Sequence, residues 1–137
     1  MMFRGHNLLC IQGYVGKGYS PEFVENMTLL TGMLADDTPV TLLDVPDLLC
    51  AACPHLVPGL GCELHGPGTE EGIVRQDRDV LDRLGFAAGE TIHWGDVKVR
   101  IAERIAPDDL DDICGKCPWL GLGHCKTGLA KLRAATP

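Results

Sequence analysis

Six of the seven cysteines fall into two segments that match each other. Each segment reads Asp-x-x-Cys-x-x-Cys-Pro-x-Leu and is followed, after a glycine-containing loop, by a third cysteine. Each cysteine of the second segment lies 63 or 64 positions after its counterpart, which indicates an internal duplication. The segments cover about residues 47–62 and 111–125, and their cysteines are Cys50, Cys53, Cys62, Cys114, Cys117 and Cys125.

This spacing is typical of metal ligation. Two cysteines three positions apart in a tight turn bring both sulfur atoms to one metal centre, and the metal binds them as thiolates. We therefore predict metal ligands, with the two Cys-x-x-Cys pairs ranked first. The third cysteines, Cys62 and Cys125, rank second because their loops differ in length.

The residue after each pair bears on the identity of the metal. It is proline in both copies, Pro54 and Pro118, and Cys-Pro closes ferredoxin-type cluster motifs. We therefore expect an iron–sulfur cluster, of the [4Fe–4S] type, with zinc as the alternative. A cubane cluster needs four ligands, so either the two segments share one cluster or each holds a site that another residue completes. The residues available for completion are Cys10, His6, His55, His65 and His124.

Other chemistry is less well supported by the sequence. Cys-x-x-Cys also permits thiol–disulfide exchange, which makes an oxidoreductase the third interpretation, although a third cysteine per copy is not needed for it. The glycine-rich stretch 13–18 lacks the spacing of a phosphate-binding loop. No catalytic residue is predicted. The acidic run 108–112 suits a helix start and could attract a basic partner.

The elements that position these residues can be read in part. Ser20-Pro21 predicts the start of a helix over 21–35, and Gly85 the end of a helix over 71–84. Residues 40–43 form the best candidate strand, whereas 6–15 fit a buried strand or a short helix. If 7–12 is a strand, residues 7–43 make a small β-α-β unit with a parallel strand pair. Further helices are expected over about 95–105, from about 106–109 and over 126–134.

Composition limits the function classes. The chain has 137 residues, 45% of them hydrophobic, which predicts one globular domain over 1–137. Its net charge of −7 disfavours nucleic acid as a partner. No apolar run is long enough to cross a membrane, and no export signal is recognisable. We therefore expect a cytoplasmic protein whose thiols are kept reduced.

The chain resembles a known family over nearly its whole length. The opening Arg4-Gly5-His6-Asn7-Leu8-Leu9-Cys10, the stretch from Gly16 to Phe23, both Cys-x-x-Cys segments and the Pro-Trp-Leu-x-x-Gly-x-Cys ending look like the family called domain of unknown function 1284. The resemblance implies an iron–sulfur protein without an assigned reaction. From the opening motif, the resemblance carries over His6 and Cys10 as possible site residues. The family opening carries two adjacent histidines where this chain has His6 and Asn7, and an amide is not a routine metal ligand.

Together these observations predict an α+β protein, mostly helical, that folds around a thiolate-bound metal centre at the junction of the two half-motifs. The leading interpretation is an iron–sulfur protein with an electron-transfer, sensing or structural role, served by a redox partner protein. The alternative is a zinc-stabilised, non-catalytic binding module.

Overall fold

The computed structural model describes residues 1–136. These residues form an α+β structure that is mostly helical, as predicted. The helices are α1 (Gly5–Gly13), α2 (Pro21–Met33), α3 (Thr69–Leu84), α4 (Trp94–Arg104), α5 (Asp109–Ile113) and α6 (His124–Ala135), with short 3-10 turns η1 (Cys50–Ala52) and η2 (Leu120–Leu122). The strands are β1 (Met2–Arg4), β2 (Pro39–Leu43), β3 (Leu56–Val57), β4 (Gly61–Cys62) and β5 (Thr91–His93).

The N-terminal strands form a parallel pair, but the first strand lies earlier than predicted. β1 pairs in parallel with β2, and β2 pairs in antiparallel fashion with β5. Of the two alternatives for 6–15, the short helix is confirmed and the strand over 7–12 is wrong, because these residues belong to α1. Helix α1 is packed on several sides, and apolar residues therefore lie around most of its circumference. Its sequence for this reason shows no clear helical period of hydrophobic residues. The β-α-β arrangement therefore runs from residue 2 to 43, with two helices in the connection.

The helices that the sequence marked most clearly are confirmed. Helix α2 begins where expected, and the Oγ of Ser20 accepts a hydrogen bond from the backbone N–H of Phe23 at 3.1 Å. Helix α3 ends at Gly85, whose φ of 74° places it in the left-handed region that favours glycine. The expected helices near 95–105, 106–109 and 126–134 correspond to α4, α5 and α6, with bounds shifted by a few residues.

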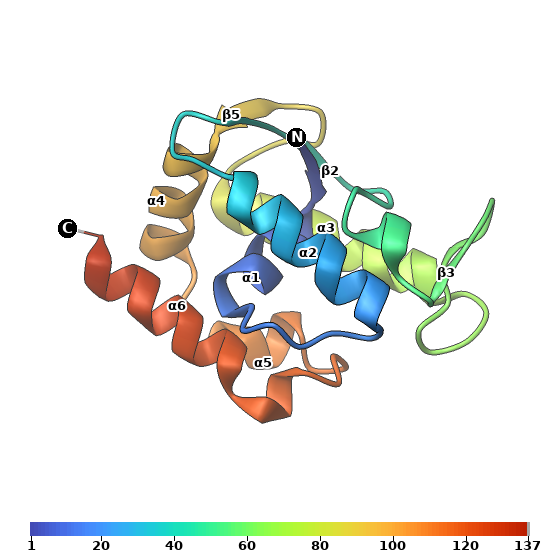
Figure 1. Cartoon of the computed structure of the whole chain (residues 1–137). Helices are drawn as coiled ribbons and strands as arrows, with labels where there is room; N and C mark the ends of the chain where they lie inside the picture. Colours follow the sequence, from blue (N-terminus) through green and yellow to red (C-terminus); the bar gives the residue numbers. More distant parts are fainter. Residues whose placement is uncertain (137) are drawn as a thin grey trace.

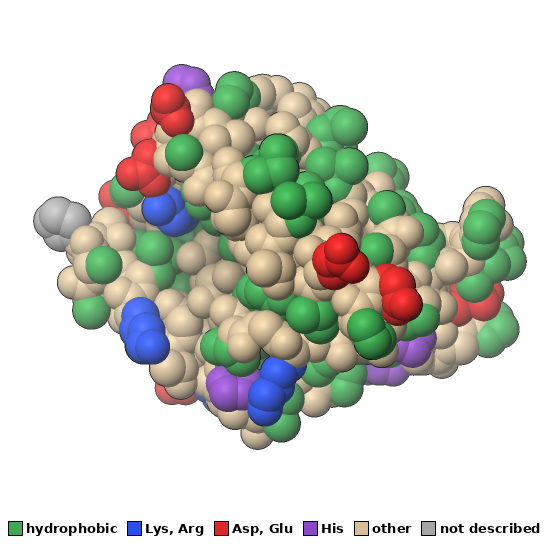
Figure 2. Space-filling view, viewed as in Figure 1, with side chains coloured by type: hydrophobic (Ala, Val, Ile, Leu, Met, Phe, Trp, Pro, Cys, Tyr) green, Lys and Arg blue, Asp and Glu red, His purple; other side chains and the backbone are tan. Residues whose placement is uncertain are grey.

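Helix α1 occupies the middle of the molecule. It packs against α6 on one side and α3 on another (Figure 1). One hydrophobic cluster draws buried residues from all six helices and from β1 and β2. The outer face of α2, by contrast, carries exposed hydrophobic side chains such as Leu29 and Met33 (Figure 2). In residues 1–136, no helix combines the length and the apolar character needed to span a bilayer.

Candidate metal centre

Both Cys-x-x-Cys pairs adopt the same backbone turn. In the first copy the N–H of Cys53 donates to the carbonyl oxygen of Cys50 at 2.9 Å, and the N–H of Leu56 donates to that of Cys53 at 3.2 Å. The corresponding bonds of the second copy join Cys117 to Cys114 at 2.8 Å and Leu120 to Cys117 at 3.2 Å. Equal spacing of cysteine and proline has therefore produced equal local structure at two distant places in the chain.

The repeated aspartate has a different role in each copy. Asp47 is buried, and its Oδ1 accepts hydrogen bonds from the backbone N–H groups of Leu49 and Cys50 at 2.9 and 3.0 Å. This bonding stabilises the turn that carries Cys50. The second aspartate, Asp111, is 60% exposed and pairs with Lys126 instead.

The third cysteines lie in unlike surroundings. Cys62 belongs to β4 and is opposite Leu56 in the short hairpin with β3. Cys125 is the second residue of α6. The two halves therefore share their turns but diverge after the second cysteine.

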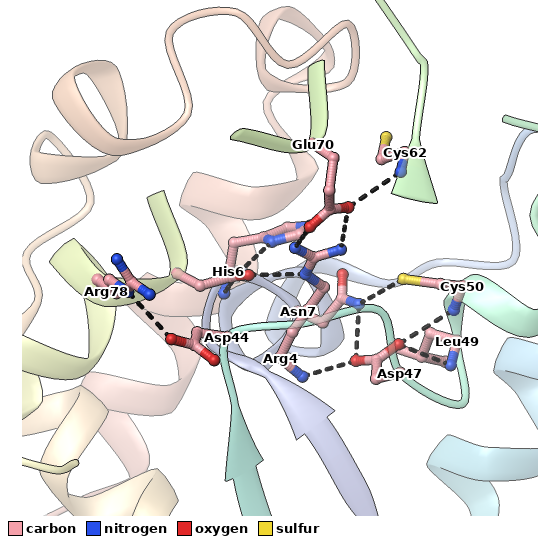
Figure 3. A network of polar contacts seen from close by, with 11 residues as sticks. Arg4, His6, Asn7, Asp44, Asp47, Leu49, Cys50, Cys62, Glu70 and Arg78 are labelled. Carbon is pink, nitrogen blue, oxygen red and sulfur yellow. Dashed lines mark hydrogen bonds and ion pairs between the residues drawn. The ribbon is translucent and has the colours of Figure 1, made fainter. Parts of the chain in front are cut away.

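A buried ionic network joins the first cysteine segment to β1 and α1 (Figure 3). The Arg4 guanidinium is fully buried and forms a bidentate pair with Glu70, with N–O distances of 3.0 and 2.6 Å. Its Nε donates to Asp77 at 2.7 Å. Glu70 Oε1 also accepts the backbone N–H of Cys62 at 2.9 Å. Through this network Arg4 is connected to the strand that carries a candidate ligand.

The charges of this network compensate one another. Burial lowers the pKa of Arg4, but the hydrogen bond to Glu70 and the charge of Asp77 outweigh it and raise that pKa above its ordinary value. Arg4 therefore stays cationic although it is buried. The Arg4 backbone N–H donates to Asp47 Oδ2 at 2.7 Å, and the Asn7 side chain donates to the same oxygen at 2.9 Å.

His6 is oriented by the same network. Its Nδ1 lies 2.6 Å from Asp77 Oδ1, and its backbone N–H donates to that oxygen at 3.0 Å. The Asp77 side chain is fully buried and the His6 side chain is 19% exposed. A carboxylate that accepts from Nδ1 leaves Nε2 as the free ring nitrogen, which is the arrangement found behind metal-bound imidazoles.

Most of the predicted ligands line one cavity of about 720 Å³. The cysteines in its wall are Cys10, Cys50, Cys53, Cys62, Cys114 and Cys117. His6, His55 and His65 line it as well. The cavity thus brings together both first-ranked pairs, one second-ranked cysteine and both additional candidates.

Cys125 lies beside this cavity rather than in its wall. It lines a separate cavity of about 20 Å³, roughly the size of one water molecule, together with Cys10, Trp119 and His124. Cys10 contributes to both cavities. Trp119 stacks on Tyr19, with ring centroids 4.4 Å apart, and both rings line the larger cavity.

All seven cysteines are free thiols. Burial, followed by the charge of Asp47, raises the pKa of Cys50 to about 12. Burial also raises the pKa of Cys53, with a backbone hydrogen bond from His55 opposing the change and the Cys62 thiol adding to it. These thiols therefore keep their protons at neutral pH until a metal displaces them.

The thiols near α1 influence one another in the same direction. Burial and then the neighbouring Cys117 and Cys125 raise the pKa of Cys114 to about 12. Burial and then Cys114, Cys117 and Cys125 raise the pKa of Cys10. Cys10 and the three cysteines of the second segment are therefore close enough to interact electrostatically.

The metal-binding part of the predicted fold class stays a prediction. Within residues 1–136, no group of three or more His, Cys, Asp or Glu side chains is arranged to hold a single metal ion. Six of the cysteines line the larger cavity instead.

Two residues of this network, Glu70 and Asp77, are not predicted by the sequence analysis. Arg4 enters it only as part of the opening motif. A signal was available, because Glu70 and Asp77 are seven residues apart and such positions share one helix face. An acidic pair on the buried side of a helix predicts a buried cation.

Comparison with known proteins identifies the family. No curated protein and no solved structure matches the chain. A family model described as "Protein of unknown function (DUF1284)" matches residues 18–123. That range holds both Cys-x-x-Cys pairs and Cys62, whereas His6, Cys10 and Cys125 lie outside it. Since the match covers well over half of the sequence, the chain belongs to this family of proteins of unknown function.

Proposed function

We propose that this protein binds an iron–sulfur cofactor in the cysteine-lined cavity and uses it for one-electron transfer. The observation that carries the proposal is the convergence of free thiols from both duplicated segments, and from α1, on one cavity. Thiolates are the ligands that iron–sulfur clusters require. The cavity is far larger than four thiols need around a single ion.

The spread of the sulfur atoms suits a cluster better than zinc. Four thiolates bound about 2.3 Å from one zinc ion lie about 3.8 Å from each other. The ligands of a cubane lie farther apart because each is bonded to a different iron atom. Six cysteines line the 720 Å³ cavity, and within residues 1–136 no three of them are grouped for a single ion, which agrees better with the second geometry. The Cys-Pro sequence at Pro54 and Pro118 supports the same choice.

The surrounding residues suit an electron-transfer site. Asp47 and Glu70 hold the backbone of Cys50 and Cys62 through hydrogen bonds. The stacked rings of Tyr19 and Trp119 form part of the cavity wall. A bound cluster would supply the redox chemistry, while these residues position its ligands and tune its potential through burial.

Thiol–disulfide exchange is disfavoured by the state of the thiols. A reactive cysteine has a lowered pKa, whereas burial raises the pKa of Cys50 and of Cys114 to about 12. Such thiols are poor nucleophiles at neutral pH. Ligation, in which the metal displaces the proton, agrees better with this environment.

The site also suggests where the protein acts. Free thiols in this number agree with a reducing compartment, and we propose the cytoplasm. Exposed carboxylates at Asp108 and Asp111, close to the second segment, would favour a redox partner protein with a basic surface.

Anaerobic purification followed by iron and acid-labile sulfide analysis tests the proposal. We expect a coloured protein with equal amounts of iron and sulfide and an absorption band that bleaches on reduction. Quantitative amino-acid analysis of the same sample supplies the protein concentration to which iron and sulfide are referred. A colourless protein with stoichiometric zinc and no sulfide would support the zinc-stabilised module instead.

A further inference from the structure

Cys10 lies with the second cysteine segment. It is three residues before Gly13 on α1, so the two share a helix face. At Gly13 the helices α1 and α6 approach so closely that an added Cβ would lie 2.5 Å from the Cα of Cys125. Cys10 and Cys125 line one small cavity, and Cys10 lines the large cavity together with Cys114 and Cys117. Four thiols from α1, α6 and the second turn are thereby gathered.

The first segment supplies only three thiols. Cys50 and Cys53 lie on the turn that Asp47 stabilises, and Cys62 lies on the hairpin that Glu70 anchors. Cys10 is the cysteine outside the two segments, and once it is assigned to the second segment no further cysteine is left to complete the first. A four-ligand site at this end of the cavity needs a donor of another type.

Among the histidines in the cavity wall, His6 is the one whose ring is oriented by a buried carboxylate. Its Nδ1 is bound to the buried Asp77 carboxylate at 2.6 Å, which leaves Nε2 free for a metal. The same ionic network reaches Cys62 through Glu70. His55, by comparison, packs edge-on against an aromatic ring, Tyr19, with ring centroids 4.8 Å apart.

We propose that the chain holds two unequal cluster sites, an inference that rests on the iron–sulfur function above. One site has four thiolates, from Cys10, Cys114, Cys117 and Cys125. The other has three thiolates and an imidazole, from Cys50, Cys53, Cys62 and His6. The two halves of the duplicated motif would therefore share their turns but differ in their ligand sets.

The two sites would differ in redox behaviour. A neutral imidazole in place of an anionic thiolate makes the cluster less negative, and histidine ligation raises the reduction potential of iron–sulfur centres. The histidine-bound site would therefore accept an electron more readily than the all-cysteine site. Electrons entering the molecule would move from the all-cysteine site to the histidine-bound site.

Paired double variants separate one shared cluster from two. The Cys50→Ser/Cys53→Ser protein and the Cys114→Ser/Cys117→Ser protein are reconstituted without oxygen beside the wild type. If there are two sites, each variant keeps about half of the iron and sulfide of the wild type. Cys10→Ser should also lose about half. Complete loss of iron in either double variant, with the chain still folded by circular dichroism, would show one shared cluster and overturn the proposal.

The histidine ligand is tested on the wild type first. Pulsed EPR of the reduced protein, prepared with ¹⁵N-labelled histidine, should show nitrogen coupling at one of its two clusters. His6→Ala should remove this coupling, and His6→Cys should keep the iron while removing the coupling. His55→Ala, a control in the same cavity wall, should leave the coupling unchanged. Lack of nitrogen coupling in the wild type, or its persistence in His6→Ala, would exclude His6.

Failure of this inference differs from failure of the proposed function. A wild type with iron and sulfide that are lost together in either double variant retains the function and rejects the two sites. A wild type without iron and sulfide rejects both.

Discussion

Arg4 shows how a single buried charge can organise a site. Its guanidinium reaches Glu70 and Asp77 on α3, while its backbone N–H reaches Asp47 beside the first cysteine pair. A buried charge is stable only when its hydrogen-bond and ion-pair partners are all in place. The network therefore fixes the positions of these groups. The positions of Cys50, Cys62 and His6 all depend on it.

Removal of this cation is expected to be costly. Arg4→Met leaves Asp77 buried without its cationic partner, and breaking a buried ion pair in this way costs about 3–5 kcal/mol. Urea unfolding of the metal-free protein measures the change. The matched control is Arg78→Met, because Arg78 pairs with Asp44 at 3.0 Å but is 66% exposed. That variant should lose no more than about 1 kcal/mol, and equal losses in the two variants would contradict the role given to Arg4.

The thiols give the metal-free protein a pH dependence. In the unfolded chain they lose their protons near pH 9.0, whereas Cys50 and Cys114 in the folded chain keep theirs up to about pH 12. Over this range the folded state binds more protons, so the free energy of unfolding falls as pH rises. The stabilisation is complete below pH 9.0 and is lost toward pH 12.

Thermal unfolding at a series of pH values measures this effect. The unfolding midpoint of the metal-free protein should fall as the pH rises above about 9. Tyr19 adds to this fall, because burial and then the neighbouring Cys117 and Cys10 raise its pKa. A Cys50→Ser/Cys114→Ser variant should show a shallower fall. The unfolding midpoint of a metal-loaded sample should not fall over this pH range, because its thiols are already deprotonated. Identical curves for loaded and metal-free protein would speak against thiolate ligation.

At the level of elements, close helix contact places Cys10 beside the second segment. A Cβ at Gly128 of α6 would collide with the carbonyl oxygen of Gln12 on α1. At Gly13 an added Cβ would lie 2.5 Å from the Cα of Cys125. Only glycine at these positions lets the two backbones meet, and that contact sets the separation of Cys10 and Cys125.

Gly128→Ala should therefore force α1 and α6 apart. Overpacking of this kind costs about 1–3 kcal/mol, and the shift should also reduce cluster content at the all-cysteine site. Gly32→Ala on α2 is the control, because nothing lies within 4 Å of the added methyl group. It should stabilise the protein by about 0.5–1 kcal/mol. Chemical unfolding gives both values, and a gain in stability for Gly128→Ala would refute the close contact.

At the level of the whole molecule, a bound cluster would connect parts of the chain that few backbone hydrogen bonds hold in place. The segments 44–68 and 114–123 are mostly turns and short strands. Ligands in both segments and on α1 would tie them to the helical core. Loading should then stabilise the native state, because the cluster binds only where these segments are folded.

Hydrogen exchange can follow this stabilisation along the chain. Amides in 50–65 and 114–123 should exchange at least about tenfold more slowly after anaerobic loading. Helix α4, which carries none of the proposed ligands, serves as the internal reference and should change little. Protection restricted to one segment would indicate that only one set of cysteines is occupied.

The sequence alone determined the features that depend on neighbouring residues. The start of α2 at Ser20-Pro21 and the end of α3 at Gly85 follow from capping and backbone conformation. The matching turns at Cys50 and Cys114 follow from a spacing of three residues. Each of these depends on interactions within a few positions, which a sequence displays directly.

Only the tertiary structure decided which distant residues meet. The sequence left residues 7–12 open between a strand and a helix, because packing on several sides removes the period that would have identified α1. Arg4 is paired with Glu70 and Asp77 because β1 ends against α3. Cys10 lies with the second segment because glycines let α1 contact α6. Such contacts depend on how whole elements fill space around one core, and short-range spacing carries little of that information.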